Sequence, residues 1–239
     1  MLGDVTEALR TTALAAPDAR GHFAAMYARV TDRVDRHIAA GRFDDEQRMD
    51  RFVRAFADWY LAPIARTRPM PSCWQAAYDV ANDDLIVVQH LLLGINAHVN
   101  HDLPQVVVEL AAQEQTVHAL QRDFDAVNDV LAEVQPAVLR DLGRVSGLTQ
   151  VAALYGGSHL FRFSLQRARA QAWDTAVRLH GMSQSARRDE VVELDRVVTA
   201  IAYLVSKPTL PLSWLLPIVR WLEVSDSAEV TRRLLGPLQ

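Results

Sequence analysis

The sequence contains one cysteine, Cys73, and one lysine, Lys207, among its 239 residues. A single cysteine excludes an intramolecular disulfide framework and a cysteine-rich zinc site. The net charge of −4 lacks the positive field that is typical of nucleic-acid-binding proteins, so we expect no nucleic-acid partner. The other basic residues are all arginine, which indicates high-GC coding and a bacterial origin rather than a particular chemistry.

Long hydrophobic runs are also missing. The longest apolar run, Leu85 to Leu93, contains Gln89 and His90 and is too short to span a bilayer. The first ten residues include acidic side chains and no basic stretch ahead of an apolar one, so no targeting segment is evident. We therefore expect a cytoplasmic protein without membrane insertion.

Alternating strand patterns with hairpin turns are absent as well. Apolar residues instead recur every three or four positions, for example between His22 and Ile38. Half of the residues are hydrophobic and 23% are charged, which is ordinary globular composition. This pattern predicts an all-α, single-domain bundle of about eight to ten helices over residues 1–239, with a buried central helix.

Proline, glycine and capping residues predict where the helices begin and end. Ser72 and Gln75 form a capping-box pattern, so a helix is expected from Cys73 to about His101, with an interruption near Asn82 left open. Pro104 is expected to kink or restart the chain. Further helices are expected over 44–63, 105–134, 158–180 and 183–207, with a break near Arg122 left open, and Pro136 is expected to punctuate the chain. An apolar helical extension should follow over 208–239.

The most informative segment places several polar side chains inside the apolar central helix. His98 and Asp102 are four residues apart and should lie on one helical face. Such a pair can provide two ligands to one metal ion, or a general base and the carboxylate that orients it. Asn96 should lie on the neighbouring face of the same helix. Burying such polar groups is costly unless each finds a hydrogen-bond partner. We therefore predict that His98, Asp102 and Asn96 line an internal polar pocket.

Other parts of the chain are expected to complete this pocket. Asp123 is a fourth candidate catalytic residue, and His90 is a candidate third metal ligand beside His98 and Asp102, with Zn²⁺ or a similar divalent ion as the possible cofactor. The candidate substrate-binding residues are His90, Asn128, Tyr27 and Arg162. Arg162, Gln166 and Arg169 share a helical stripe that could hold an anionic substrate.

Structural roles explain the same residues without catalysis. A His–Asp pair at this spacing can be a buried hydrogen bond, Asp123 can cap a helix, and the arginine stripe can be a solvated face. Motifs of serine hydrolases, P-loop proteins, zinc metalloproteases and Rossmann domains are absent. The residues alone therefore leave a site and a structural network both open.

The central segment also resembles a known family. The run Leu92-Leu-Gly-Ile-Asn-Ala-His-Val-Asn-His-Asp-Leu-Pro104 resembles the LLGxNAHxxxDLP hallmark of a bacterial and fungal family of unknown function. Asp123-Phe-Asp-Ala-Val-Asn128 resembles its second block, and the similarity extends over about residues 20–205. The resemblance implies an all-α domain but no activity.

Two functions from different classes follow. The first is an enzyme for a small-molecule substrate, either a metal-assisted hydrolase or an acid/base enzyme that cyclises or rearranges a natural product in biosynthesis. The alternative is a non-catalytic ligand-binding or protein-interaction module. In that case the apolar stretch from Leu210 to Leu222, with Trp214 and Trp221, is a candidate homodimer surface.

Overall fold

Helices account for 80% of the chain in the computed structural model, and the described residues contain no strand. The structure describes residues 1–114, 116–146, 157–209 and 212–236, without the side chains of 157–164 and 212–215. The all-α multi-helix bundle predicted from the sequence is confirmed.

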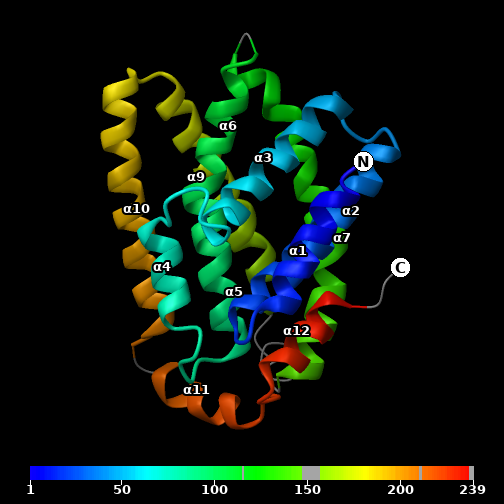
Figure 1. The fold of residues 1–239 in the computed structure, drawn as a ribbon, viewed down its shortest axis with the longest axis vertical. Helices are drawn as coiled ribbons and strands as arrows, with labels where there is room; N and C mark the ends of the chain where they lie inside the picture. Colours follow the sequence, from blue (N-terminus) through cyan, green and yellow to red (C-terminus); the bar gives the residue numbers. More distant parts are fainter. Residues whose placement is uncertain (115, 147–156, 210–211, 237–239) are drawn as a thin grey trace.

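Three long helices begin the chain: α1 (Gly3–Ala15), α2 (Arg20–Ala39) and α3 (Glu46–Ile64). α1 packs along α2, on the right of the bundle in Figure 1. After α2 the chain turns at Gly41, whose φ of +66° is readily accessible only to glycine. α3 is capped by Asp45, which accepts a hydrogen bond from the backbone N–H of Arg48 at 2.8 Å.

The predicted helix from Cys73 to His101 is interrupted between Asp79 and Val87, around the break considered at Asn82. α4 (Ser72–Asp79) is separate, and α5 (Val87–Ile95) continues through a π-helix, η1 (Asn96–Asp102), into α6 (Leu103–Ala111). Of the two outcomes expected at Pro104, the chain restarts: α6 begins at Leu103, with Pro104 in its first turn. Pro104 has no N–H to donate to the Asn100 carbonyl, and the chain accommodates the lost α-helical bond with the wider π-turns.

The next elements are the 3₁₀ turn η2 (Val117–Leu120), α7 (Gln121–Val145), α9 (Gly157–His180) and α10 (Gln184–Ser206). The expected helix over 105–134 is thus broken between α6 and α7, just ahead of the break considered near Arg122. Pro136 does not end α7, because a buried stripe of Val130, Val134, Val138 and Leu142 continues across it. Packing of this stripe outweighs the one hydrogen bond that proline cannot make.

Two short helices end the described chain, α11 (Leu212–Trp221) and α12 (Ser227–Leu235). α12 packs against α1, α2 and α7 through four buried residues, namely Val230, Thr231, Leu234 and Leu235. The C-terminal segment is therefore packed into the same bundle as the N-terminal helices (Figure 1).

The arrangement places η1 among six helices. α5 and α6 run through the middle of the bundle in Figure 1, with α4 and α10 on one side and α1, α2 and α7 on the other. η1 contacts α3, α4, α9 and α10 as well as its own neighbours α5 and α6. Each of the helices that the structure describes is too short or too polar to cross a lipid bilayer.

Candidate active site

Asp102, the last residue of η1, is completely buried, and its carboxylate forms hydrogen bonds with three ring nitrogens. Trp74 Nε1 donates to its Oδ2 at 2.9 Å, and His98 Nδ1 lies 3.0 Å from the same oxygen. His101 Nδ1 lies 2.7 Å from Oδ1. An ionised carboxylate only accepts hydrogen bonds, so we assign the Nδ1–H tautomer to both histidines. These contacts stabilise a charge that would be costly to bury alone.

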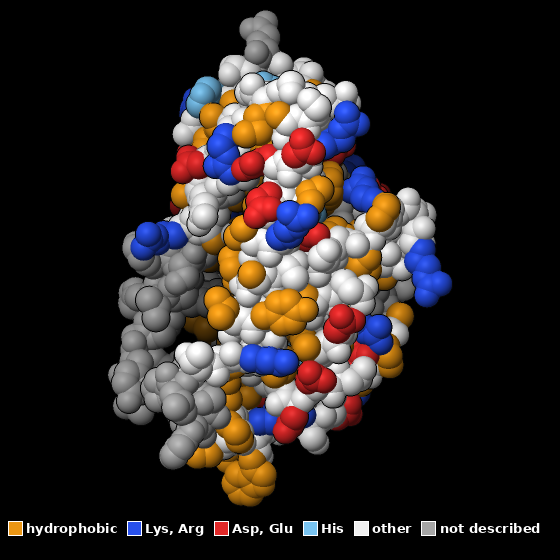
Figure 2. Space-filling view, turned by 90° about the vertical axis from the view of Figure 1, so that its left-hand side faces the viewer, with side chains coloured by type: hydrophobic (Ala, Val, Ile, Leu, Met, Phe, Trp, Pro, Cys, Tyr) orange, Lys and Arg blue, Asp and Glu red, His pale blue; other side chains and the backbone are white. Residues whose placement is uncertain are grey.

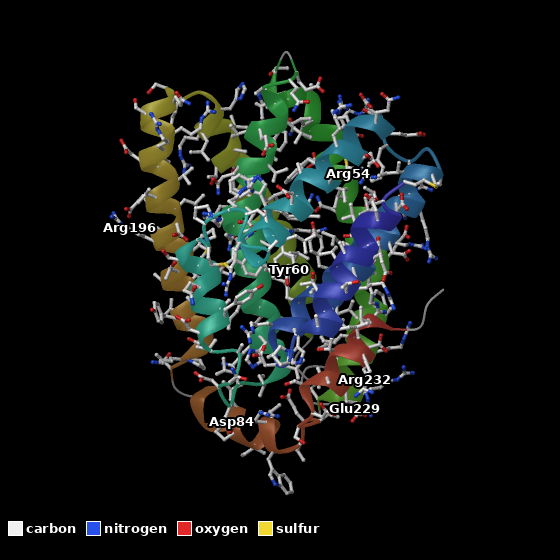
Figure 3. The ribbon with its side chains drawn as sticks, in the orientation of Figure 1. Arg54, Tyr60, Asp84, Arg196, Glu229 and Arg232 are labelled. Atoms are coloured by element: carbon white, nitrogen blue, oxygen red, sulfur yellow. The ribbon has the colours of Figure 1, made fainter. Side chains whose placement is uncertain are left out.

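His98 is enclosed by aromatic rings. Its imidazole stacks on Phe56, with ring centroids 3.6 Å apart and an interplanar angle of 7°, and Tyr27 approaches edge-on at 4.6 Å. Phe23, Trp74 and Tyr60 complete this aromatic box. Of these, Tyr60 is labelled at the centre of the bundle in Figure 3. Burial lowers the pKa of His98, with Asp102 opposing the shift, so the ring is neutral at pH 7.

A cavity of about 920 Å³ lies beside His98. Its walls come from α2, α3, α5, η1, α7 and α9, and most of its lining side chains are valine, leucine, methionine or phenylalanine. Its volume is near the upper end of the range for drug-sized ligands. The structure thus corrects the expectation of a polar pocket: the space beside His98 is mainly apolar.

In the described part of the chain, three buried side-chain atoms of cavity-lining residues have no hydrogen-bond partner. They are His98 Nε2, Tyr27 Oη and Thr31 Oγ1, and each residue is more than nine-tenths buried. Tyr27 and Thr31 are one turn apart on α2. Burial raises the pKa of Tyr27 well above its ordinary value, so its hydroxyl stays protonated. Unpartnered buried atoms are rare, so these three are the polar atoms of the cavity-lining residues for which the protein supplies no partner.

The cavity wall on α9 contains a buried cation. Arg169 Nε donates to Asn128 Oδ1 at 2.8 Å, and its Nη2 donates to the Phe124 carbonyl at 2.6 Å. Both acceptors are neutral, and within the described ranges no carboxylate lies within ion-pair distance. Burial lowers the pKa of Arg169 to about 10. Asp125 acts on this guanidinium only through space and opposes the shift, so among the described residues the positive charge has no carboxylate in direct contact.

The structure brings together part of the predicted site. His98, Tyr27 and Asn128 line the cavity, and Asp102 lies behind His98. Asn96 does not line it: its amide donates to the Val198 carbonyl at 2.9 Å and accepts from Asn100, which ties η1 to α10. Gln166 and Arg169, from the predicted stripe, also line the cavity.

Other predicted members lie elsewhere. Asp123 accepts hydrogen bonds from the Asp44 backbone N–H and from Arg48 Nη2, both at 2.6 Å, and so fixes the start of α3. His90 lies against His22, with ring centroids 5.9 Å apart. The expected gathering of Asp123 or His90 with His98 is therefore wrong, because each packs against a different partner. The Arg162 side chain lies outside the described residues.

Several residues of the site were not predicted. Thr31 could have been found from its four-residue spacing to Tyr27, because both would then share a helical face. Trp74, Phe56 and His101 gave no comparable signal. They reach Asp102 or His98 through tertiary packing of α4 and α3, and through the altered turn of η1.

The expected metal set of His98, Asp102 and His90 does not assemble, since His90 packs against His22 on α2. A different group of potential ligands is close together: Cys73, His101 and Asp195 each place one ligand atom within 4.8 Å of the other two. Burial raises the pKa of the Cys73 thiol, so this cysteine is not an activated nucleophile.

Comparison with known proteins identifies a family but no activity. No curated protein and no solved structure matched the chain significantly. One family model matches residues 2–208, which is most of the chain and more than the similarity noted in the sequence. On this match, the chain belongs to the family of unknown function DUF5995.

Proposed function

We propose that this protein is an acid/base enzyme that acts on an apolar small molecule with an anionic group. The observation that carries the proposal is the His98–Asp102 pair at the wall of the apolar cavity. His98 Nδ1–H is held by Asp102, and its Nε2 has no protein partner. This is the arrangement of a general base with its orienting carboxylate.

The surroundings suit proton transfer. The neutral ring can take a proton from a substrate hydroxyl or an acidic carbon at Nε2. The imidazolium then formed is stabilised by Asp102 and by the electron-rich faces of the aromatic box. In the apolar cavity these electrostatic interactions are stronger than they would be in water. His98 therefore has the position and the resting protonation state of a general base.

Tyr27 and Thr31 supply the complementary donors. Both hydroxyls are unpartnered and belong to residues that line the same cavity as His98. A protonated phenol and an alcohol can donate hydrogen bonds to a substrate oxygen as negative charge develops on it. This favours isomerisation or ring closure of a substrate that forms an enolate or alkoxide.

Arg169 supports the anionic part of the substrate. A buried guanidinium with only neutral acceptors gains more from a carboxylate than an exposed one, because the charge is already desolvated. The apolar remainder of the substrate would fill the space between α2, α3 and α7. We therefore propose substrates such as hydroxy- or keto-carboxylic acids with bulky apolar chains.

Binding and turnover can be tested separately. Oleate and oleyl alcohol share one chain and differ in the anionic group, so calorimetry should show tighter binding of oleate. Arg169→Gln should reduce this preference about tenfold, because the charge-assisted contact is lost. Arg196→Gln, which changes an exposed arginine on α10 (Figure 3), is the matched control. Equal preference in wild type and Arg169→Gln would contradict the anion site.

Turnover is tested with a panel of apolar hydroxy- and keto-acids analysed by mass spectrometry. His98→Gln should retain oleate binding and lose roughly 100-fold or more in rate, as expected for a missing general base. A His98→Gln protein with wild-type turnover would contradict the catalytic role.

Non-catalytic binding is the second candidate, favoured by the apolar lining of the cavity. It predicts that wild type and His98→Gln bind oleate equally and that neither converts any compound of the panel. The same two experiments therefore distinguish an enzyme from a carrier.

We also propose a homodimer through the end of α11 and the residue after it, where Ile218, Trp221 and Leu222 are exposed, Trp221 by 83%. Hydrophobic side chains are visible at the lower end of the molecule in Figure 2. Analytical ultracentrifugation of wild type and Trp221→Ser would show the dimer and its loss. The cytoplasmic location and bacterial origin stay predictions.

A further inference from the structure

We propose that Cys73, His101 and Asp195 bind a divalent metal ion of the zinc type, outside the cavity. The three residues come from α4, η1 and α10, and their potential ligand atoms all lie within 4.8 Å of one another. Sulfur, imidazole nitrogen and carboxylate oxygen are the three donor types that Zn²⁺ takes in proteins. This inference does not depend on the proposed reaction at His98.

The distances are close to those of a tetrahedral site. Zinc–ligand bonds of about 2.0–2.3 Å place neighbouring ligand atoms roughly 3.3–3.8 Å apart. The three atoms would therefore move towards a shared ion by about 1 Å or less. Cys73 and His101 are buried, and Asp195 is half-buried, so the group reaches the surface at one edge. A water molecule can take the fourth position from that edge.

Asp102 orients His101 as a metal-binding histidine requires. Its Oδ1 lies 2.7 Å from His101 Nδ1, and it fixes the proton on that nitrogen. Nε2 is then the nitrogen with a lone pair. Histidine ligands of metals usually donate their other ring N–H to a carboxylate in this way. The amide nitrogen of Gln105 lies 3.3 Å from Nε2 and 3.4 Å from Nδ1 and donates to the His101 carbonyl at 2.9 Å, so it packs against the ring and leaves the Nε2 lone pair for an ion.

Two hydrogen bonds hold the Asp195 carboxylate in place, and each of its oxygens keeps a lone pair that can bind a metal ion. The backbone N–H groups of Ser72 and Cys73 each donate to one of its oxygens at 2.9 Å. Each carboxylate oxygen has a second lone pair that a cation can use. When the ion binds, the Cys73 S–H bond breaks, its proton goes to solvent and a sulfur–metal bond forms. One thiolate and one carboxylate then neutralise the charge of +2, which favours a buried site.

The ion would connect three helices and the candidate active site. Asp102 binds His101 through Oδ1 and His98 through Oδ2, so a fixed His101 also fixes the carboxylate that orients His98. The metal would thus act as a structural clip behind the cavity. The competing explanation is that Asp195 only caps the N-terminus of α4 by hydrogen bonds.

Co²⁺ is a suitable probe because it occupies zinc sites and absorbs visible light. Cys73 is the only cysteine, so a thiolate-to-cobalt charge-transfer band can come from no other residue. Full-length protein stripped of metal should develop this band and the visible bands of tetrahedral cobalt, and Zn²⁺ should displace both. The melting temperature should rise with Zn²⁺ concentration.

Variants localise the site. Cys73→Ser and His101→Gln should each weaken Co²⁺ binding at least tenfold by calorimetry and abolish the rise in melting temperature. His118→Gln, at an exposed histidine on η2, should bind as wild type does. Circular dichroism verifies that each variant is folded, and either ligand variant alone is sufficient for the test.

Two results would overturn the proposal. One is the absence of cobalt bands and of a zinc-dependent melting shift in the wild-type protein. The other is wild-type affinity in folded Cys73→Ser or His101→Gln, which would assign the binding to surface groups. Neither result bears on turnover by His98, which is measured separately.

Discussion

Gly94 allows the backbone of α5 to contact the aromatic box. A Cβ atom at this position would lie 2.5–2.7 Å from the Phe23 side chain, closer than such contacts occur. Phe23 in turn packs edge-on against His98 and Tyr60. The space beside Gly94 is thus filled by Phe23, and the glycine sets how closely α2 and α5 approach.

We predict that Gly94→Ala destabilises the protein by about 1–3 kcal/mol, because Phe23 must move in a packed core. Alanine has the better helix propensity by about 1 kcal/mol, so propensity alone predicts the opposite sign. Urea unfolding measures the change. Gly3→Ala, where a Cβ meets nothing within 4 Å, is the control and should not destabilise. A Gly94→Ala protein as stable as wild type would contradict the close packing.

At the scale of elements, the C-terminal segment fixes the start of α5. Glu223 follows α11 and accepts hydrogen bonds from the Val87 N–H at 3.0 and 3.3 Å. The next residue, Val224, donates its N–H to the Val145 carbonyl at the end of α7. These residues lie beyond the family match, which ends at residue 208. The C-terminal segment therefore supports α5, the helix that leads into η1, although the segment itself lies outside the region matched by the family.

We predict that Glu223→Ala costs about 1–3 kcal/mol of stability, because a buried backbone donor loses its acceptor. Glu223→Gln should cost less, since the amide oxygen can still accept. Hydrogen exchange should quicken at the first turn of α5 in Glu223→Ala. Glu193→Ala, which removes an exposed pair on α10, is the control. Unchanged exchange in α5 would contradict the capping role.

For the whole molecule, two buried histidines at the contact of α2 and α5 link stability to pH. The ring centroids of His22 and His90 lie 5.9 Å apart, and the charge of one ring disfavours protonation of the other. Burial lowers the pKa of each from 6.5 to about 4. Asp18 opposes both shifts and Arg220 adds to them. The folded protein therefore keeps both rings neutral at pH values where the unfolded chain is protonated.

Stability should accordingly fall as the pH decreases from 6.5 towards 4. In this window the unfolded state binds more protons, so the free energy of unfolding decreases with falling pH. The loss is roughly 2 kcal/mol for each histidine by pH 5. Urea unfolding at pH 7 and pH 5 measures it. The double variant His22→Asn, His90→Asn should lose clearly less, and an equal loss would assign the pH dependence to carboxylates.

Local patterns were sufficient to predict the helical fold class and one contact of the site. Helix periodicity and capping residues act within a few positions, so α2, α9 and α10 were predicted close to their observed bounds. The His98–Asp102 contact also follows from spacing along one helix. Such features depend on neighbours in the sequence and are encoded there directly.

Tertiary structure decided the remaining features. The π-helix at η1 places both His98 and His101 on Asp102, which α-helical spacing does not predict. Asp123 and His90 were assigned to the site by polarity, but each found a nearer partner in another helix. The cavity and the group of Cys73, His101 and Asp195 are formed by helices far apart in sequence. A sequence read by itself gives residue types and their spacing along the chain. The distances between residues of different helices are determined only when the side chains of those helices pack together.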